Sequence, residues 1–163
     1  MVQAMYPLIS YNVGGRNYPH IKSLLHVAMK YSFIIGLGVY LAIFIFKDII
    51  IGFFTNGNTE LTDMTRDAVT FMTPAYLISF VNIIGSSFHT AIEMPLESAV
   101  IAVCKSLVFV LIPLTILPDL FESIRMDYKL GIWLSIPVGE IMCLSVTVPL
   151  MYLSTRRLMR ALT

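Results

Sequence analysis

Four long apolar stretches, at residues 31–46, 71–92, 99–117 and 132–153, dominate this chain of 163 residues. A hydrocarbon core of ~30 Å needs roughly 20 mainly apolar helical residues to cross it, and each stretch reaches that length with its flanks. The composition agrees, because 57% of the residues are hydrophobic, 13% are charged and the mean hydropathy is +0.81. The sequence therefore predicts an all-α membrane protein, a polytopic bundle of transmembrane helices, and argues against a water-soluble domain.

We expect a single membrane domain over residues 1–163, with transmembrane helices at residues 21–54, 67–92, 97–117 and 130–154. The opening run, residues 1–13, is apolar but about half a span long, which is typical of the end of a truncated helix. Residues 21–30 are amphipathic, so we expect this segment to lie along the membrane interface before the first span enters the bilayer. Its apolar face carries Ile21, Leu24, Leu25 and Ala28.

Small and polar residues mark the expected turns. Asn12 and Gly14 halt the opening helix, and Thr62 is a plausible cap for the helix that follows the loop at residues 55–60. A hairpin turn is expected at residues 93–97, and a second polar loop at residues 118–129.

Prolines and glycines shape the expected spans. Pro74 should kink the second span, and Pro113 lies inside the third. Gly36 and Gly38 would allow another helix to approach the first span closely.

Several function classes find no support. The net charge of +1 is too small to favour a nucleic-acid partner. Cys104 and Cys143 fall inside apolar spans, where thiols act as small hydrophobic residues, so we expect no metal site. No phosphate-binding loop, paired metal ligands or nucleophile motif is present, and the sequence predicts neither an enzyme nor a cofactor.

Glu140 is the strongest candidate for a functional residue. It lies near the middle of the fourth span, where an unpaired carboxylate costs several kcal/mol and so should be neutralised, paired or hydrated. Pro137, three residues earlier, frees a backbone carbonyl and gives a polar notch that can hold a cation or a substrate group. The alternative is a protonated Glu140 that serves helix packing.

Other polar residues lie at membrane depth. Asn82 either bridges helices or lines a polar path together with Tyr76, Ser79 and Ser86. Lys105 lies about one turn into the third span, where we expect it to extend towards the lipid headgroups.

His89 stands near the end of the second span. A lone histidine at that place is more often an interface residue.

The distribution of basic residues favours a cytoplasmic C-terminus. Four spans place six bases on one side of the membrane and four on the other, and positive residues prefer the cytoplasmic side. The six are Arg16, Lys22, Lys30, Arg156, Arg157 and Arg160, and the four are Lys47, Arg66, Arg125 and Lys129.

Four segments of the chain carry a resemblance to a known family. They are residues 6–18 (YPLISYNVGGRNY), 82–88 (NIIGSSF), 112–118 (IPLTILP) and 131–140 (GIWLSIPVGE). Together they resemble the multidrug and toxin extrusion (MATE) transporters. The pattern Pro-x-x-Ser-Tyr-Asn-x-Gly-Ala-x-Asn ends a helix in that family, and this chain is similar in the segment that holds Pro7, Asn12 and Gly14, with Gly15 where alanine is usual.

The resemblance implies a twelve-helix antiporter of two lobes in the plasma (inner) membrane, which expels cationic or amphipathic compounds in exchange for protons or sodium. This chain would form a partial C-terminal lobe that starts late in the eighth helix, and upstream helices of the same transporter would be its partners. Asn82 and Glu140 would face the central cavity. Residues 71–92 lack the carboxylate that some members use for sodium, so the coupling ion stays open.

Two alternatives remain. One is a flippase-like membrane protein that moves lipid-linked oligosaccharides, which would favour a more basic cavity than Lys105 alone provides. The other is a truncated, non-functional transporter fragment. We expect residues 1–163 alone not to transport, because alternating access needs two lobes that move around a shared site.

Overall fold

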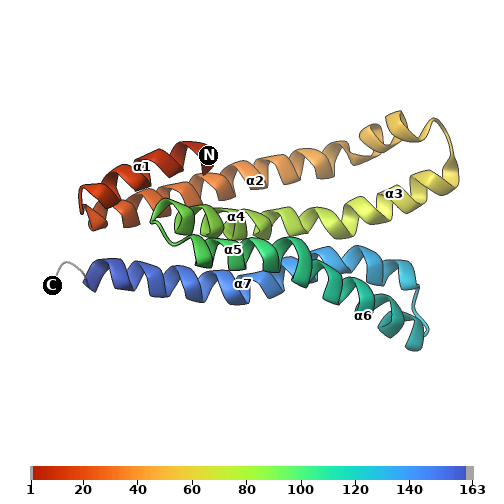
Figure 1. The fold of residues 1–163 in the computed structure, drawn as a ribbon. Coiled ribbons are helices and arrows are strands. Elements are labelled where there is room, and N and C mark those ends of the chain that lie inside the picture. The colour runs from red at the N-terminus through yellow and green to blue at the C-terminus, as the bar shows by residue number, and fades with distance from the viewer. Residues whose placement is uncertain (1, 161–163) are drawn as a thin grey trace.

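A computed structural model describes residues 2–160, and these residues form helices joined by short turns (Figure 1). The elements in chain order are α1 (Val2–Gly14), α2 (Tyr18–Thr55), α3 (Thr59–Met72), the 3₁₀ helix η1 (Thr73–Ala75), α4 (Tyr76–Ala91), α5 (Pro95–Val103), the π-helix η2 (Cys104–Val108), α6 (Phe109–Ser123) and α7 (Tyr128–Arg160).

The described residues contain four helical stretches long and apolar enough to cross a membrane. They are Tyr18–Thr55, Thr59–Ala91, Pro95–Ser123 and Tyr128–Arg160, so α3 with α4 makes one span and α5 with α6 another. Exposed apolar side chains cover their outer surfaces, as lipid contact requires. The predicted class, a polytopic bundle of transmembrane helices, is confirmed.

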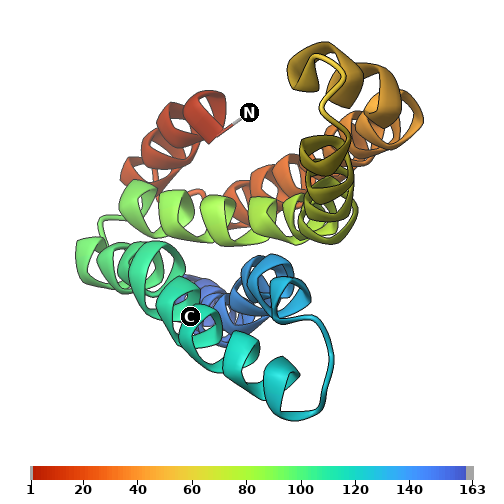
Figure 2. The ribbon, with the colours of Figure 1, turned by 90° about the vertical axis from the view of Figure 1, so that its right-hand side faces the viewer.

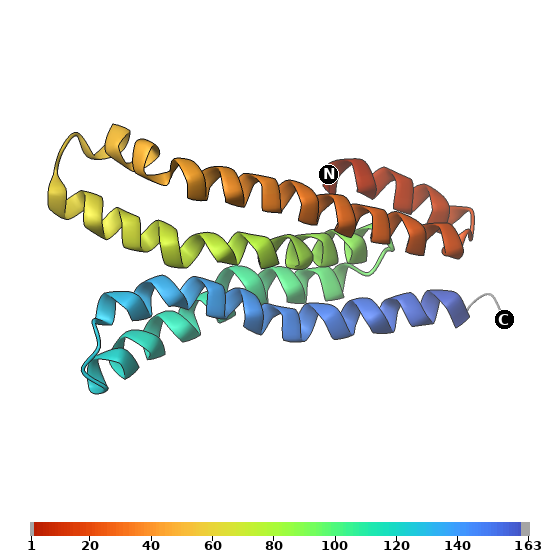
Figure 3. The same cartoon turned by 180° about the vertical axis from the view of Figure 1, so that it is seen from behind.

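The spans run antiparallel (Figures 1 and 3). The start of α2, the α4–α5 turn and the end of α7 lie at one end of the bundle, which we call the basic end. It carries the chain's Arg16, Lys22, Arg156, Arg157 and Arg160. The turns after α2 and after α6 lie at the opposite end.

Figure 2, turned by 90°, shows α2, α3 and α4 on one side of the molecule and α5, α6 and α7 on the other. Helix α4 packs against α5 and α7 as well as against α1 and α2, and so connects the two sides.

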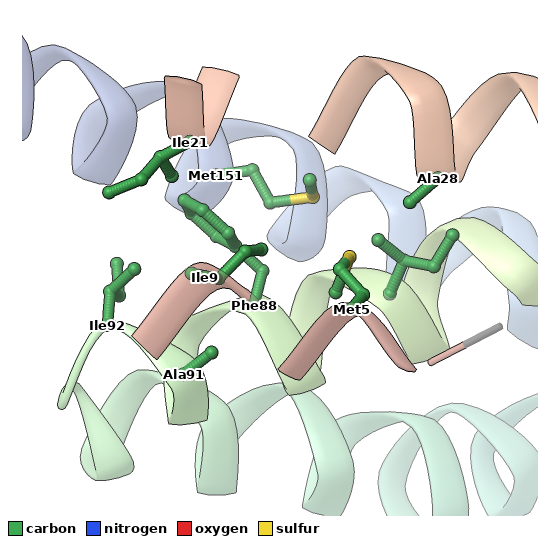
Figure 4. Close-up of a cluster of buried hydrophobic side chains, with 9 residues drawn as sticks. Met5, Ile9, Ile21, Ala28, Phe88, Ala91, Ile92 and Met151 are labelled. Carbon is green, nitrogen blue, oxygen red and sulfur yellow. The ribbon is translucent and has the colours of Figure 1, made fainter. Parts of the chain in front are cut away.

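A cluster of buried apolar side chains joins α1, α2, α4 and α7 near the basic end (Figure 4). Phe88 and Ile9 are fully buried at its centre. Its members are Met5, Ile9, Ile21, Ala28, Ile84, Phe88, Ala91, Ile92 and Met151. The predicted apolar face of residues 21–30 therefore exists, but it packs on protein. Helix α2 is continuous from Tyr18 to Thr55, so the expected separate interfacial helix is wrong.

Pro74 interrupts the second span as predicted. Its ring cannot donate to a helical hydrogen bond, and the chain tightens into the 3₁₀ helix η1 between α3 and α4. The hairpin turn expected at residues 93–97 is present but ends earlier, because α5 begins at Pro95, and Glu93 takes a left-handed conformation at φ 60°.

Several helix boundaries differ from the sequence prediction, and at two places the cause is a local interaction or residue. The cap of α3 is Asn58, whose side chain accepts a hydrogen bond from the Leu61 amide at 3.1 Å, and Thr62 instead donates to the Asn58 carbonyl. Helix α6 continues past Leu117 to Ser123, because a proline inside a helix bends or weakens it without always ending it. The second polar loop is correspondingly shorter.

Close helix contacts occur at glycines other than the predicted ones. A Cβ at Gly139 would lie 2.0 Å from the Phe109 carbonyl oxygen, and one at Gly85 would lie 2.3 Å from Thr147 Cγ2. A Cβ added at Gly36 or Gly38, by contrast, would have no atom of another described helix within 4 Å. Gly139 thus sets the distance between α7 and the start of α6.

We predict that Gly139→Ala destabilises the bundle, because the added methyl group meets backbone that cannot rotate away. Overpacking of this kind costs about 1–3 kcal/mol. Thermal unfolding of the purified chain in detergent should show a lower melting temperature for this variant. Gly38→Ala is the matched control and should melt like the parent chain; equal melting of the two variants would contradict the predicted close contact.

Candidate functional site

Three helices bring Asn82, Lys105 and Glu140 together inside the bundle. The Glu140 carboxylate accepts from Lys105 Nζ through Oε1, and from Asn82 Nδ2 through Oε2 at 2.8 Å. Asn82 Nδ2 also lies 3.1 Å from the Glu140 carbonyl oxygen. Asn82 is on α4, Lys105 on η2 and Glu140 on α7, so this polar cluster ties three of the four spans together.

The π-helix positions the lysine. Lys105 is the second residue of η2, whose wider turn shifts the side-chain register relative to a regular α-helix. From there its ammonium also donates to Ser79 Oγ on α4 at 2.6 Å. The next element begins at Phe109, whose carbonyl is the group that Gly139 approaches. The glycine beside Glu140 therefore brings α7 close enough for the ion pair to form.

The Lys105–Glu140 pair is largely shielded from solvent, with side-chain exposures of 23% and 13%. A lone carboxylate at this depth would cost several kcal/mol, and pairing with an ammonium and an amide offsets much of that cost. The sequence predicts that Glu140 is neutralised, paired or hydrated, and the structure shows it paired with Lys105. The local arrangement combines one negative and one positive charge.

The cluster forms part of the wall of a groove of about 450 Å³. Its lining residues are Asn82, Ile83, Ser86, Ser87, Ala102, Lys105, Ser106 and Glu140. Asn82 is fully buried, and its Oδ1 atom has no donor among the described residues. Buried polar atoms normally find a partner. This oxygen is therefore a free acceptor beside the carboxylate, a combination suited to a cation or a hydrogen-bond donor.

The predicted site residues are distributed unevenly. Asn82, Ser86 and Glu140 line the groove, whereas Tyr76 is 66% exposed and lies outside it. Pro137 stands one turn before Glu140 within α7. Ser86 bonds to Ser98 on α5, with the two hydroxyls 3.0 Å apart.

The motif residues of the opening segment lie outside the groove. Pro7 is inside α1, Asn12 Nδ2 donates to the Leu8 carbonyl at 2.7 Å, and Gly14 ends the helix. Pro113 is buried in α6.

Lys105 was not predicted as a site residue. The expectation that it extends to the headgroups is wrong, because its ammonium turns inward to Glu140 and Ser79. An opposite charge in a neighbouring apolar span is the one sequence signal that favours pairing over extension to the headgroups.

His89 also differs from its expected place at the interface. It is fully buried, with Nδ1 2.7 Å from the Gly85 carbonyl oxygen and Nε2 3.1 Å from Ser154 Oγ on α7. A hydroxyl on the facing helix supplies the partner that its burial requires.

We predict that Lys105 and Glu140 are energetically coupled. Lys105→Gln and Glu140→Gln should each lower the melting temperature of the purified chain, because each leaves an uncompensated charge. The free energy of unfolding lost in the double variant should be smaller than the sum of the two single losses, by roughly 1–3 kcal/mol. Additive losses in this double-mutant cycle would contradict a stabilising interaction between Lys105 and Glu140 in the folded protein.

Comparison with known proteins identifies the family but no individual relative. No curated protein and no solved structure matches the chain significantly. The MatE family model matches residues 1–116, which is more than half of the chain and includes Asn82 and Lys105. Residues 131–140, the fourth resembling segment, lie outside the match. The family resemblance predicted from the sequence is confirmed, and the chain belongs to the MatE family of membrane efflux transporters.

Proposed function

We propose that this chain takes part in cation-coupled efflux of cationic or amphipathic compounds, with the groove at Asn82, Lys105 and Glu140 as part of the ion or substrate pathway. One observation carries the proposal: the Glu140 carboxylate stands at membrane depth in a groove, beside the buried Asn82 Oδ1, which has no donor in the part of the chain that the structure describes. Ionisable groups inside transmembrane segments mark ion and substrate pathways.

The ion pair suggests how coupling would work. Lys105 acts as a tethered cation that keeps Glu140 compensated when the groove is empty. A proton on Glu140, or a metal cation against its oxygens, would release the lysine and change the contacts between η2 and α7. The ligand and the lysine then compete for one carboxylate, so ligand binding shifts the bundle towards the arrangement in which the lysine is released. Proton and sodium both fit this competition.

Pro137 would assist the change. A proline within a helix leaves the carbonyl four residues earlier without its usual donor and weakens the helix locally. We propose that this weak point lets the part of α7 that carries Glu140 move. Tyr76, which is exposed and lies outside the groove, would contact the ion or substrate only before it enters the groove.

We further propose that other helices of the same transporter complete the working protein. Alternating access needs two bundles that rock around a site, and four spans make part of one. We place the protein in the plasma (inner) membrane with the basic end, and hence the C-terminus, on the cytoplasmic side, because bases prefer that side.

The flippase alternative finds less support. A lipid-linked anionic substrate would need free basic groups in the cavity, whereas the groove's lysine is engaged by Glu140. We therefore keep efflux as the proposal.

Binding of ethidium to the purified chain in detergent tests the role of the groove. We expect Glu140→Gln to weaken binding tenfold or more, since a hydrogen bond or contact to a charged group is worth about 1.5–3 kcal/mol. Glu140→Asp should retain part of the affinity, and acid or sodium should compete with the dye in the parent chain. Fluorescence anisotropy measures all of these.

Glu122→Gln is the matched control, because Glu122 is an exposed acid at the far end of α6. It should bind ethidium like the parent chain. Equal affinities for the parent, Glu140→Gln and Glu122→Gln would remove the groove from the pathway, and absence of any dye binding would favour a non-functional fragment.

A further inference from the structure

A second pocket, of about 470 Å³, lies at the basic end between the start of α2 and the last turns of α7. This is the end where α7 finishes, at Arg160, in Figure 1. The pocket is lined by Lys22, Tyr152, Thr155, Arg156, Met159 and Arg160. Its volume falls within the range of small-molecule sites, roughly 300–1,000 Å³. None of its residues belongs to the groove at Glu140.

The pocket is positively charged. Three of its six lining residues are basic and none is acidic. Within residues 2–160, neither Lys22 nor Arg156 forms an ion pair with a carboxylate. The acids of this end, Glu93 and Glu97, belong to the α4–α5 turn and the first turn of α5, outside the lining. Such a pocket is complementary to an anion.

An apolar surface adjoins the charged one. The Arg156 guanidinium lies over the Tyr152 ring, 5.0 Å from its centre, and Tyr152 is 57% exposed. One turn further into the membrane Val148 is 52% exposed, and Ile141 continues the same outward side of α7 at 55%. A ligand with an anionic head and an apolar tail would match both surfaces, whereas a free anion would leave the apolar surface bare.

The position of the pocket across the membrane agrees with such a ligand. At 1.5 Å per residue, the 33 residues of α7 extend about 50 Å, more than the ~30 Å hydrocarbon core. The last turns of α7 therefore reach the headgroup layer. Tyr152, two turns before the end, stands where aromatic residues commonly mark the membrane–water boundary.

We propose that this pocket binds an anionic phospholipid, with the phosphate held by Lys22, Arg156 and Arg160 and an acyl chain along the exposed side of α7. Basic pockets between transmembrane helices recognise anionic headgroups. At the opposite end acids outnumber bases among the described residues, so that end does not favour an anion. Its acids are Asp48, Glu60, Asp63, Asp67, Asp119, Glu122 and Asp127. The inference requires that the bundle sits in a bilayer with this side of α7 open to lipid, and it does not depend on the proposed efflux.

Native mass spectrometry of the purified chain tests the proposal, with added dioleoyl phosphatidylglycerol or dioleoyl phosphatidylcholine as probes. The parent chain should retain phosphatidylglycerol in preference to phosphatidylcholine. The double variant Lys22→Gln/Arg156→Gln should lose roughly 30-fold in affinity for phosphatidylglycerol, as expected for two basic residues near the headgroup. Both residues are exposed, and circular dichroism verifies that the helices remain.

Arg16→Gln/Arg157→Gln is the matched control, since it removes the same charge from the same end but spares the pocket lining. It should keep the preference of the parent chain. Equal losses in both double variants would mean diffuse electrostatic attraction and would overturn the site. Retention of phosphatidylglycerol and phosphatidylcholine at equal levels by the parent chain would also overturn it.

Glycerol 3-phosphate distinguishes a lipid from a free anion. It should fail to displace phosphatidylglycerol at equal concentration, because it lacks the acyl chains that cover α7. Displacement at equal concentration would assign the pocket to a soluble anion and overturn the lipid assignment.

Discussion

A carboxylate inside a hydrocarbon solvent must be compensated by the protein, and in this bundle that requirement organises the centre of the fold. Glu140 is shared between the Lys105 ammonium and the Asn82 amide, each from a different span. The attraction is strong at this depth because little water screens it. Three helices are thereby held in one register, and any ligand that takes the carboxylate must replace the lysine.

Backbone irregularities make this pairing possible. The π-helix at Cys104–Val108 turns Lys105 towards α4 and α7, and Gly139 lets α7 contact the backbone at Phe109. Pro74 and Pro137 add weak points in the other two helices that bear the cluster. Irregular turns and prolines are tolerated in a membrane where neighbouring helices satisfy the freed groups, and they concentrate at functional places. The polar cluster and the local departures from ideal helix are thus parts of one arrangement.

Sequence reasoning was reliable where a local cause acts alone. Pro74 interrupts the second span and Pro95 begins α5 directly after a hairpin turn, because proline lacks an amide hydrogen and restricts the backbone locally. It failed where packing decides. The amphipathic face of residues 21–30 is real, but α1, α4 and α7 cover it instead of the interface. Likewise the tight helix contacts fall at Gly85 and Gly139 and not at the predicted Gly36 and Gly38. A glycine allows another helix to approach closely, but it does not show that another helix is there.

Hydropathy alone determined that this chain is a bundle of membrane helices, because lipid forces every apolar stretch of sufficient length into one backbone conformation. Length and charge likewise indicated Glu140 as the acid that needs a partner. Which partner it has was decided by the tertiary structure. The packing of the helices brings Lys105 to Glu140 and buries His89 against Ser154, and it leaves the Asn82 side-chain oxygen without a donor among residues 2–160. These depend on how separate helices pack against each other, and no local pattern in one helix encodes the position of another.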